Sequence, residues 1–174
     1  MTCGVKFLEM SRDYLKGDFL PRIERAVAGL NDVDIWWRPN EASNSIGNLI
    51  LHLCGNVRQW IVSGVGGAPD ARDRQAEFDR RQPMPREELL VLLRRTIREV
   101  DQTLARVTEE ELLLPRTIQG YDTTVLGAIY HVVEHFSMHT GQILLLAKAR
   151  TGEDLGLYRM TGPGIAKPAW RDDG

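Results

Sequence analysis

The sequence predicts an all-α protein built as a four-helix bundle, and three observations lead to this fold class. Apolar residues recur every three or four positions in four long stretches, as on one face of an α-helix. No stretch shows the strict alternation of apolar and polar residues that is typical of a half-buried strand. Each amphipathic helix must bury its apolar face, and a bundle buries four such faces against one core.

The length and composition suit one globular domain. With 174 residues, of which 43% are hydrophobic and 26% charged, the chain is long enough for one sizeable core and too short for two typical domains. We therefore expect residues 1–174 to form a single domain, with the bundle at about 5–150. The stretch 151–174 is too rich in glycine and proline to be helical, and we expect an irregular tail there.

The first predicted helix covers about residues 5–30, and Gly17 and Pro21 inside it are expected to kink or break it. The second predicted helix has a candidate N-cap at residues 44–45 and ends near Ser63. Its apolar stripe consists of Ile46, Leu49, Ile50, Leu53, Val57, Trp60 and Ile61.

The third predicted helix covers about residues 86–107 and is opened by Pro85, because proline suits the first turn of a helix. The fourth can be capped by a threonine at residues 123–124 and reaches about Arg150. Between the third and fourth helices we expect at most a short hairpin, near residues 118–121.

A long surface connection is predicted between the second and third helices, from Gly64 to Pro85, because this stretch is rich in glycine, proline and charge. Connections of this length are either functional or mobile. Charges of both signs alternate in it and indicate a solvated, ion-paired surface rather than an anion-binding site. These charged residues are Asp70, Arg72, Asp73, Arg74, Glu77, Asp79, Arg80 and Arg81.

Charge and cysteine usage exclude several classes of function. A net charge of -2 provides no global attraction to nucleic acid or anionic lipid, so we expect neither partner. The first residues carry charges throughout and contain no long apolar run, which argues against a signal peptide or a membrane span. Cys3 and Cys54 form neither a CxxC metal motif nor a disulfide framework. This pattern is typical of a reducing compartment, and we expect a cytoplasmic protein.

Three of the four histidines lie in one short stretch, HVVEHFSMH, at His131, His135 and His139. Side chains four residues apart on an α-helix lie nearly above one another, so their imidazoles can share one ion. His131 and His139 are about 12 Å apart along the helix axis, and one metal can therefore take only one of the two adjacent pairs. The apolar stripe of this helix lies nearest to His135 and His139, which are therefore the inward-facing pair.

The third ligand of such a site would have to be His52, the one histidine elsewhere in the chain. His52 falls roughly 130° from the centre of the apolar stripe of its helix, so periodicity by itself favours a surface histidine. Three imidazoles nevertheless suit a catalytic zinc-type site, which leaves one coordination position open for water or substrate.

A competing interpretation is that HVVEH matches the H-x-x-E-H motif of inverse zincin peptidases. In that case His131 and His135 would bind the metal, and Glu134 would be the general base. Glu134 points away from the core on the helical wheel, and the sole downstream glutamate available as a third ligand is Glu153. Both features weigh against a peptidase.

Two segments of the chain resemble a known family. The segment IWWRPNEASNSIGNLILHLCGNVRQWI, followed by HVVEHFSMHTGQILLLAK, resembles the DinB-like (DinB/YfiT) superfamily of metal-dependent proteins, which includes bacillithiol transferases and mycothiol-dependent enzymes. The resemblance implies a four-helix bundle whose metal ligands are His52 in LHLCGN and His135 and His139 in HFSMHTGQ. Thr140 stands where relatives often have arginine, which argues against a cationic substrate anchor at that position.

The resemblance also implies a function, namely a divalent-metal-binding protein that activates a low-molecular-weight thiol for S-transfer. The implied cofactors are a divalent transition metal, zinc or nickel, and the thiol. We expect a small-molecule substrate and, from the habit of the family, a homodimer. Two alternatives stay open: a metal-dependent hydrolase that uses metal-bound water, and a non-catalytic metal-binding protein associated with stress. No catalytic or thiol-binding side chain is assigned, but we expect the connection or the tail to border the metal pocket.

Overall fold

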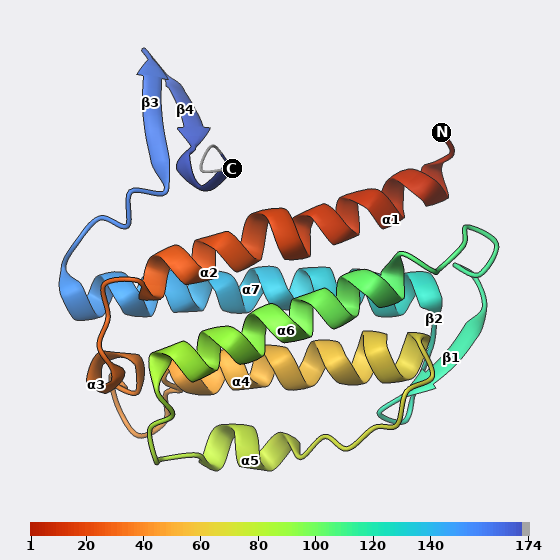
Figure 1. Cartoon of the computed structure of the whole chain (residues 1–174), viewed down its shortest axis with the longest axis horizontal. Coiled ribbons are helices and arrows are strands. Elements are labelled where there is room, and N and C mark those ends of the chain that lie inside the picture. The colour runs from red at the N-terminus through yellow and green to blue at the C-terminus, as the bar shows by residue number, and fades with distance from the viewer. Residues whose placement is uncertain (172–174) are drawn as a thin grey trace.

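The computed structural model describes residues 1–171 and consists mainly of helices (Figure 1). The predicted four-helix bundle is confirmed. Its four long helical stretches are α1 (Cys3–Asp13) continued by the π-helical η1 (Tyr14–Phe19) and α2 (Leu20–Val27); α4 (Ile46–Val57) continued by the π-helical η2 (Arg58–Val65); α6 (Arg86–Leu104); and α7 (Val125–Thr151). A single short turn of helix, α3 (Asp32–Ile35), lies between the first and second stretches.

Two of the helix starts are fixed by the side chains that the sequence marks as caps. Ser45 and Asn48 form a capping box at the start of α4, in which each side chain bonds to the backbone of the other residue. Thr124 caps α7 by accepting the N–H of Gly127 at 3.1 Å. Among residues 1–171, no helix is both long and apolar enough to cross a membrane.

The sequence predicted that Gly17 and Pro21 would kink or break the first helical stretch, and the helix is not broken there. Pro21 has no N–H to donate to the carbonyl of Gly17, and in a regular α-helix its ring would clash with that carbonyl. The chain passes through the wider π-helical turns of η1 and enters α2 without leaving the helical path.

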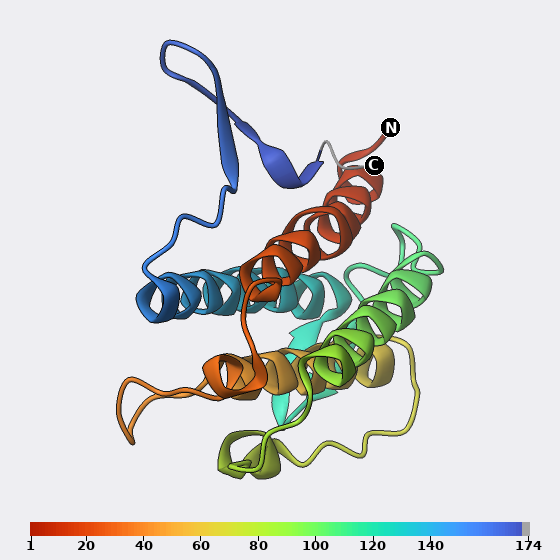
Figure 2. The ribbon, with the colours of Figure 1, turned by 60° about the vertical axis from the view of Figure 1, so that its left-hand side comes forward.

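The core is one apolar cluster to which all four stretches contribute. α4 packs beside both α6 and α7, and the two views agree on this arrangement (Figures 1 and 2). The buried apolar residues of α7 include Val125, Ile129, Val132, Phe136, Ile143 and Ala147. Their spacings of three, four and seven residues place them on one face of the helix, as periodicity predicts. α4 and α7 are therefore neighbours whose side chains can meet.

The connection between the second and third stretches, predicted as a long surface segment, is partly helical. It contains α5 (Arg74–Asp79), which lies along the outer side of α4 (Figure 1). Asn48 of α4 is fully buried, and its Nδ2 donates to the backbone carbonyls of Glu77 at 2.8 Å and Arg80 at 3.2 Å. These bonds hold α5 against the bundle.

A short antiparallel hairpin lies where the sequence predicts one. It consists of β1 (Pro115–Ile118) and β2 (Tyr121–Thr124), with Ile118 opposite Tyr121. Gln119 and Gly120 form its turn with φ values of 54° and 79°, a left-handed conformation that glycine adopts without strain. The hairpin packs against η2 and leads directly into α7.

The prediction of an irregular tail, and of at most one hairpin in the chain, is wrong for the described part of the tail. β3 (Tyr158–Gly162) and β4 (Ile165–Pro168) form a second antiparallel hairpin, followed by a short 3-10 turn, η3 (Ala169–Arg171). Gly164, with φ of 74°, allows the tight reversal, so glycine here favours a hairpin turn. The second hairpin extends from the α1 and α2 side of the bundle (Figure 2). Residues 172–174 lie outside the described residues.

Candidate metal centre

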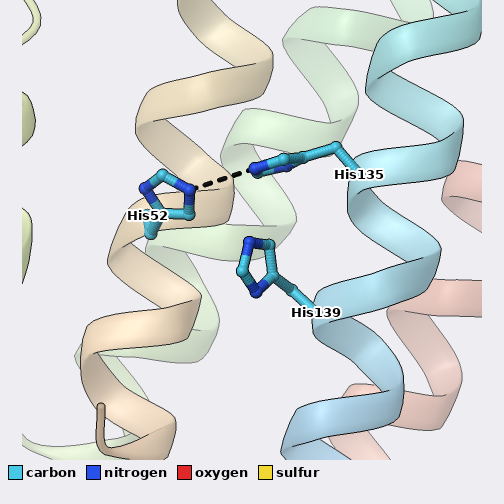
Figure 3. A group of neighbouring side chains, drawn as sticks. All are labelled: His52, His135 and His139. Atoms are coloured by element: carbon cyan, nitrogen blue, oxygen red, sulfur yellow. Dashed lines mark hydrogen bonds between the residues drawn. The ribbon is translucent and has the colours of Figure 1, made fainter. Parts of the chain in front are cut away.

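Three histidines from two helices meet between α4 and α7 (Figure 3). His52 belongs to α4, whereas His135 and His139 lie one turn apart on α7. Each residue offers a ring nitrogen, and these nitrogen atoms all lie within 4.8 Å of one another. The Nε2 atoms of His52 and His135 are 3.1 Å apart. The structure thus brings together the three residues that the resemblance implies as ligands.

His131 lies outside this group. Its ring centroid is 4.2 Å from the ring of Trp60 and 5.4 Å from that of His135. Glu134, the base that an inverse zincin would need, is exposed on α7. The geometry therefore favours His135 with His139 over His131 with His135.

His52 is buried, with 5% of its surface exposed, although periodicity favours a surface position. The physical reason is a tertiary contact that periodicity does not report. The connection covers this face of α4, and the ring of Phe78 from α5 lies 4.6 Å from the His52 ring. In the sequence, the one signal for this contact is Phe78, an aromatic residue within a charged run, which favours packing of this part of the connection against the bundle.

A buried ion pair from the connection contacts His52. Arg72 binds the carboxylate of Glu77 through two bonds, Nε to Oε1 at 2.7 Å and one Nη atom to Oε2 at 2.8 Å. The two side chains are only 4% and 10% exposed. Glu77 Oε2 lies 2.9 Å from His52 Nδ1. The prediction of a solvated surface is therefore wrong for this pair, which the sequence reasoning missed as part of the site.

The ring nitrogens of the histidines have different partners. His139 Nδ1 lies 2.7 Å from Oε1 of Gln142, one turn further along α7. An amide oxygen and a carboxylate can only accept, so these two contacts are hydrogen bonds when the Nδ1 atoms of His139 and His52 carry the protons. Their Nε2 lone pairs are then free to face the third histidine. His135 Nδ1 is buried and has no hydrogen-bond partner among the described residues.

The pKa values of the histidines on α7 are shifted toward the neutral, metal-binding form. Burial, reinforced by the neighbouring His139 and His52, lowers the pKa of His135 from 6.5 to about 3. Burial also lowers the pKa of His139 and that of His131. Burial by itself would raise the pKa of Glu77, but the hydrogen bonds from Arg72 and His52 outweigh it, and the pKa lies below its usual value. These shifts favour neutral imidazoles at His135 and His139 and an ionised carboxylate at Glu77.

The residues present fit a divalent metal ion. Imidazole nitrogens bind zinc at about 2.0–2.1 Å. The 3.1 Å between the Nε2 atoms of His52 and His135 is therefore short enough for both to reach one ion. Without an ion, the two nitrogen atoms are joined by a hydrogen bond (Figure 3), and a metal ion would take the place of its proton.

A pocket of about 420 Å³ opens beside two of the three histidines of the site, His52 and His135, whereas His139 does not line it. It is lined by His52, Asn56, Trp60, Arg72, Arg74, Gln119, Tyr121, His131 and His135. Arg72 and Arg74 come from the connection, as expected for a segment that borders the site. None of the tail residues described lines this pocket. Gln119 and Tyr121 come from the first hairpin, and no sequence pattern pointed to them.

The comparisons with known proteins agree with the fold. A family model described as a protein of unknown function, DUF1572, matches residues 2–160. A crystal structure of a conserved protein from Enterococcus faecalis superimposes with a TM-score of 0.69 at 16% identity, covering 83% of this chain and 97% of that one. A DinB-like protein from Bacillus cereus ATCC 10987 gives a TM-score of 0.63 at 14% identity, covering 79% and 88%.

At these identities the two structures show a shared fold alone. No curated protein matches the chain. The match to the family model spans nearly the whole bundle, including all three histidines of the site. The chain therefore belongs to the DUF1572 family of proteins of unknown function, and it has the DinB-like fold that its two histidine segments predict.

Proposed function

We propose that the chain is a metal-dependent enzyme in which His52, His135 and His139 hold a divalent transition-metal ion, zinc or nickel. The observation that carries this proposal is the convergence of three imidazole nitrogens beside a pocket. Imidazole is a ligand that suits both metals. Because neutral ligands leave the charge of the ion uncompensated, it would act as a strong Lewis acid and favour the deprotonated form of a thiol or water.

The surroundings of the histidines favour thiol chemistry over hydrolysis. Free water is far less acidic than a free thiol, so a hydrolase gains more from a general base within reach of its water. Glu77 lies on the Nδ1 side of His52 and is engaged by Arg72, while Glu134 is exposed on α7. A thiol, with an ordinary pKa of about 8.5, depends less on such a base once the ion lowers its pKa. We therefore propose S-transfer: the thiol sulfur bonds to an electrophilic carbon as the bond to the leaving group breaks. The leaving group takes the electron pair, and the thiol proton passes to solvent.

The pocket suits a small molecule with an anionic group. Its volume of about 420 Å³ is in the range of small-molecule sites. Arg74 lines it with the guanidinium 5.0 Å from the ring centre of Phe78, and within residues 1–171 it has no acidic partner. Thr140 is buried and donates to the carbonyl of Phe136 at 2.8 Å, so it does not face a substrate. Arg74 is thus the cation placed to bind a carboxylate of the thiol or its acceptor.

The test has two stages. Protein purified without a metal-affinity column is first analysed for bound metal, and a content far below one ion per chain would contradict the metal site. Zinc- and nickel-loaded protein is then assayed with cysteine, glutathione and mercaptosuccinate against a chromogenic aryl halide, with His139→Ala as the inactive reference. Turnover above this reference supports the transferase. Ester hydrolysis without conjugation would support the hydrolase, and bound metal with neither activity would support a non-catalytic metal-binding protein.

A further inference from the structure

The ion pair between Arg72 and Glu77 lies on the side of His52 that faces away from the other two histidines. Glu77 Oε2 accepts from two donors, His52 Nδ1 at 2.9 Å and an Nη atom of Arg72 at 2.8 Å. The same Nη atom lies 3.1 Å from His52 Nδ1, a contact that is a hydrogen bond only if Nδ1 carries no proton. That tautomer would place an imidazole lone pair against the carboxylate oxygen of Glu77 at the shorter distance of 2.9 Å, so we assign the proton to Nδ1 of His52.

This tautomer determines which nitrogen of His52 is available to a metal. With Nδ1 bonded to Glu77, the lone pair of Nε2 faces His135 Nε2 at 3.1 Å. The bond to Glu77 also restrains rotation of the ring. A carboxylate on the second nitrogen increases the electron density of the imidazole and strengthens it as a ligand. Arg72 balances the buried negative charge, so that Glu77 can accept the hydrogen bond without retaining a proton.

The rest of the connection is built around this contact. Gly55 lies on α4 next to the pair, and a Cβ atom at this position would collide with the carboxylate of Glu77. A further Nη atom of Arg72 donates to Gln59 Oε1 at 3.0 Å, and Asn48 holds the backbone carbonyl of Glu77 at 2.8 Å. Both ends of the ion pair are thus tied to the helix that carries His52.

We propose that Glu77, held by Arg72, is a positioning residue of the metal centre: it fixes His52 in the Nδ1–H tautomer and directs Nε2 toward the ion. The inference rests on the proposed metal site, because it assigns Glu77 a role only through His52. It also assigns a function to the charged connection, which is to complete the site from outside the bundle.

The first test is the affinity for Zn²⁺, measured by competition with a chromophoric chelator. Glu77→Ala is expected to weaken zinc binding by about 10- to 100-fold, the range found when a partner that orients a ligand is removed. Glu77→Gln should lose less, because its amide oxygen can still accept from His52. Asp79→Ala is the matched control: it removes one acid from the same helix, and Asp79 bonds to Gln75 rather than to a histidine. Equal zinc affinities for Glu77→Ala and Asp79→Ala would overturn the proposal.

The second test reads the tautomer directly, and its decisive measurement is made on the wild type. Long-range proton–nitrogen correlation spectra of the metal-free protein should show His52 with its proton on Nδ1, and Glu77→Ala should shift the population toward Nε2–H. A dominant Nε2–H form in the wild type would overturn the proposal even if Glu77→Ala did not fold. His52→Ala separates the two ideas. If it binds zinc like the wild type, the proposed metal site fails, whereas an empty His52→Ala beside a fully loaded Glu77→Ala refutes only the positioning role.

Discussion

Replacing each of the four histidines by alanine, one at a time, should rank them by their contribution to metal binding. His52, His135 and His139 offer ring nitrogens within 4.8 Å of one another, so each variant removes one of three ligands. His131 stacks on Trp60 at 4.2 Å and lies outside that group. The expected order is therefore three variants with a large loss and one, His131→Ala, that retains the ion.

The magnitude follows from what each ring does. Removing a group that only orients a ligand weakens metal binding by about 10- to 100-fold. Removing the ligand itself should cost at least as much, which corresponds to about 1.4–2.8 kcal/mol or more at about 1.4 kcal/mol per factor of ten. His131→Ala should reduce the zinc affinity only slightly, because His131 is a neighbour of the site and not a ligand: its ring centroid is 5.4 Å from that of His135.

The assay is metal content by elemental analysis together with the zinc dissociation constant, for the four variants purified side by side without an affinity column. Circular dichroism confirms that each variant is folded, so that an empty site reports a missing ligand. The inverse zincin interpretation demands the opposite order for two of the variants. An empty His131→Ala beside a fully loaded His139→Ala would refute the assignment.

Three further predictions follow from the surroundings of the site. Arg74→Gln should raise KM for mercaptosuccinate by about tenfold with kcat unchanged, which equals the loss of about 1.4 kcal/mol of binding; an equal effect on the uncharged 2-mercaptoethanol would contradict an anion anchor. The metal-free protein should lose stability as pH falls from 6.5 toward 3, because the lowered pKa of His135 means that the unfolded chain binds a proton there and the folded chain does not. Urea midpoints measured at pH 7 and pH 5 check this, and His135→Ala should show a smaller difference than the wild type. Gly55→Ala should weaken zinc binding because its Cβ displaces the Glu77 carboxylate, and an unchanged dissociation constant would argue that this contact is dispensable.

The helices could be predicted from the sequence because their signals are local. The caps at Ser45 and Thr124 and the apolar stripe of α7 depend on residues within a few positions of one another. The same is true of His135 and His139, whose spacing of four places them together on any α-helix. The inward orientation of these two histidines then follows from the position of the apolar stripe, without knowledge of the rest of the fold.

The parts that could not be predicted depend on contacts between segments distant in sequence. His52 is buried because α5 covers it, and no property of α4 alone reports this contact. Arg72 and Glu77 carry charges that favour a solvated position, and only their mutual pairing and the bond to His52 allow burial. In the tail, glycine and proline correctly identified a segment that is not helical. The hairpin of β3 and β4 also depends on contacts of Trp170, whose ring lies 5.2 Å from the Tyr158 ring and 5.0 Å from the guanidinium of Arg22.

The need to orient each imidazole explains why the site extends beyond the bundle. Packed helices fix where the Cβ atom of a histidine lies, but the ring can still rotate and can carry its proton on either nitrogen. A hydrogen bond to the second ring nitrogen removes both freedoms. For His139 this bond comes from Gln142, which lies three residues further along the same helix, so a sequence motif of that helix contains both residues. For His52 it comes from Glu77, 25 residues away in the connection, so the periodicity of α4 gives no sign of this partner. A segment with a weak pattern of its own can therefore be as necessary to the geometry of the centre as the helices that supply the ligands.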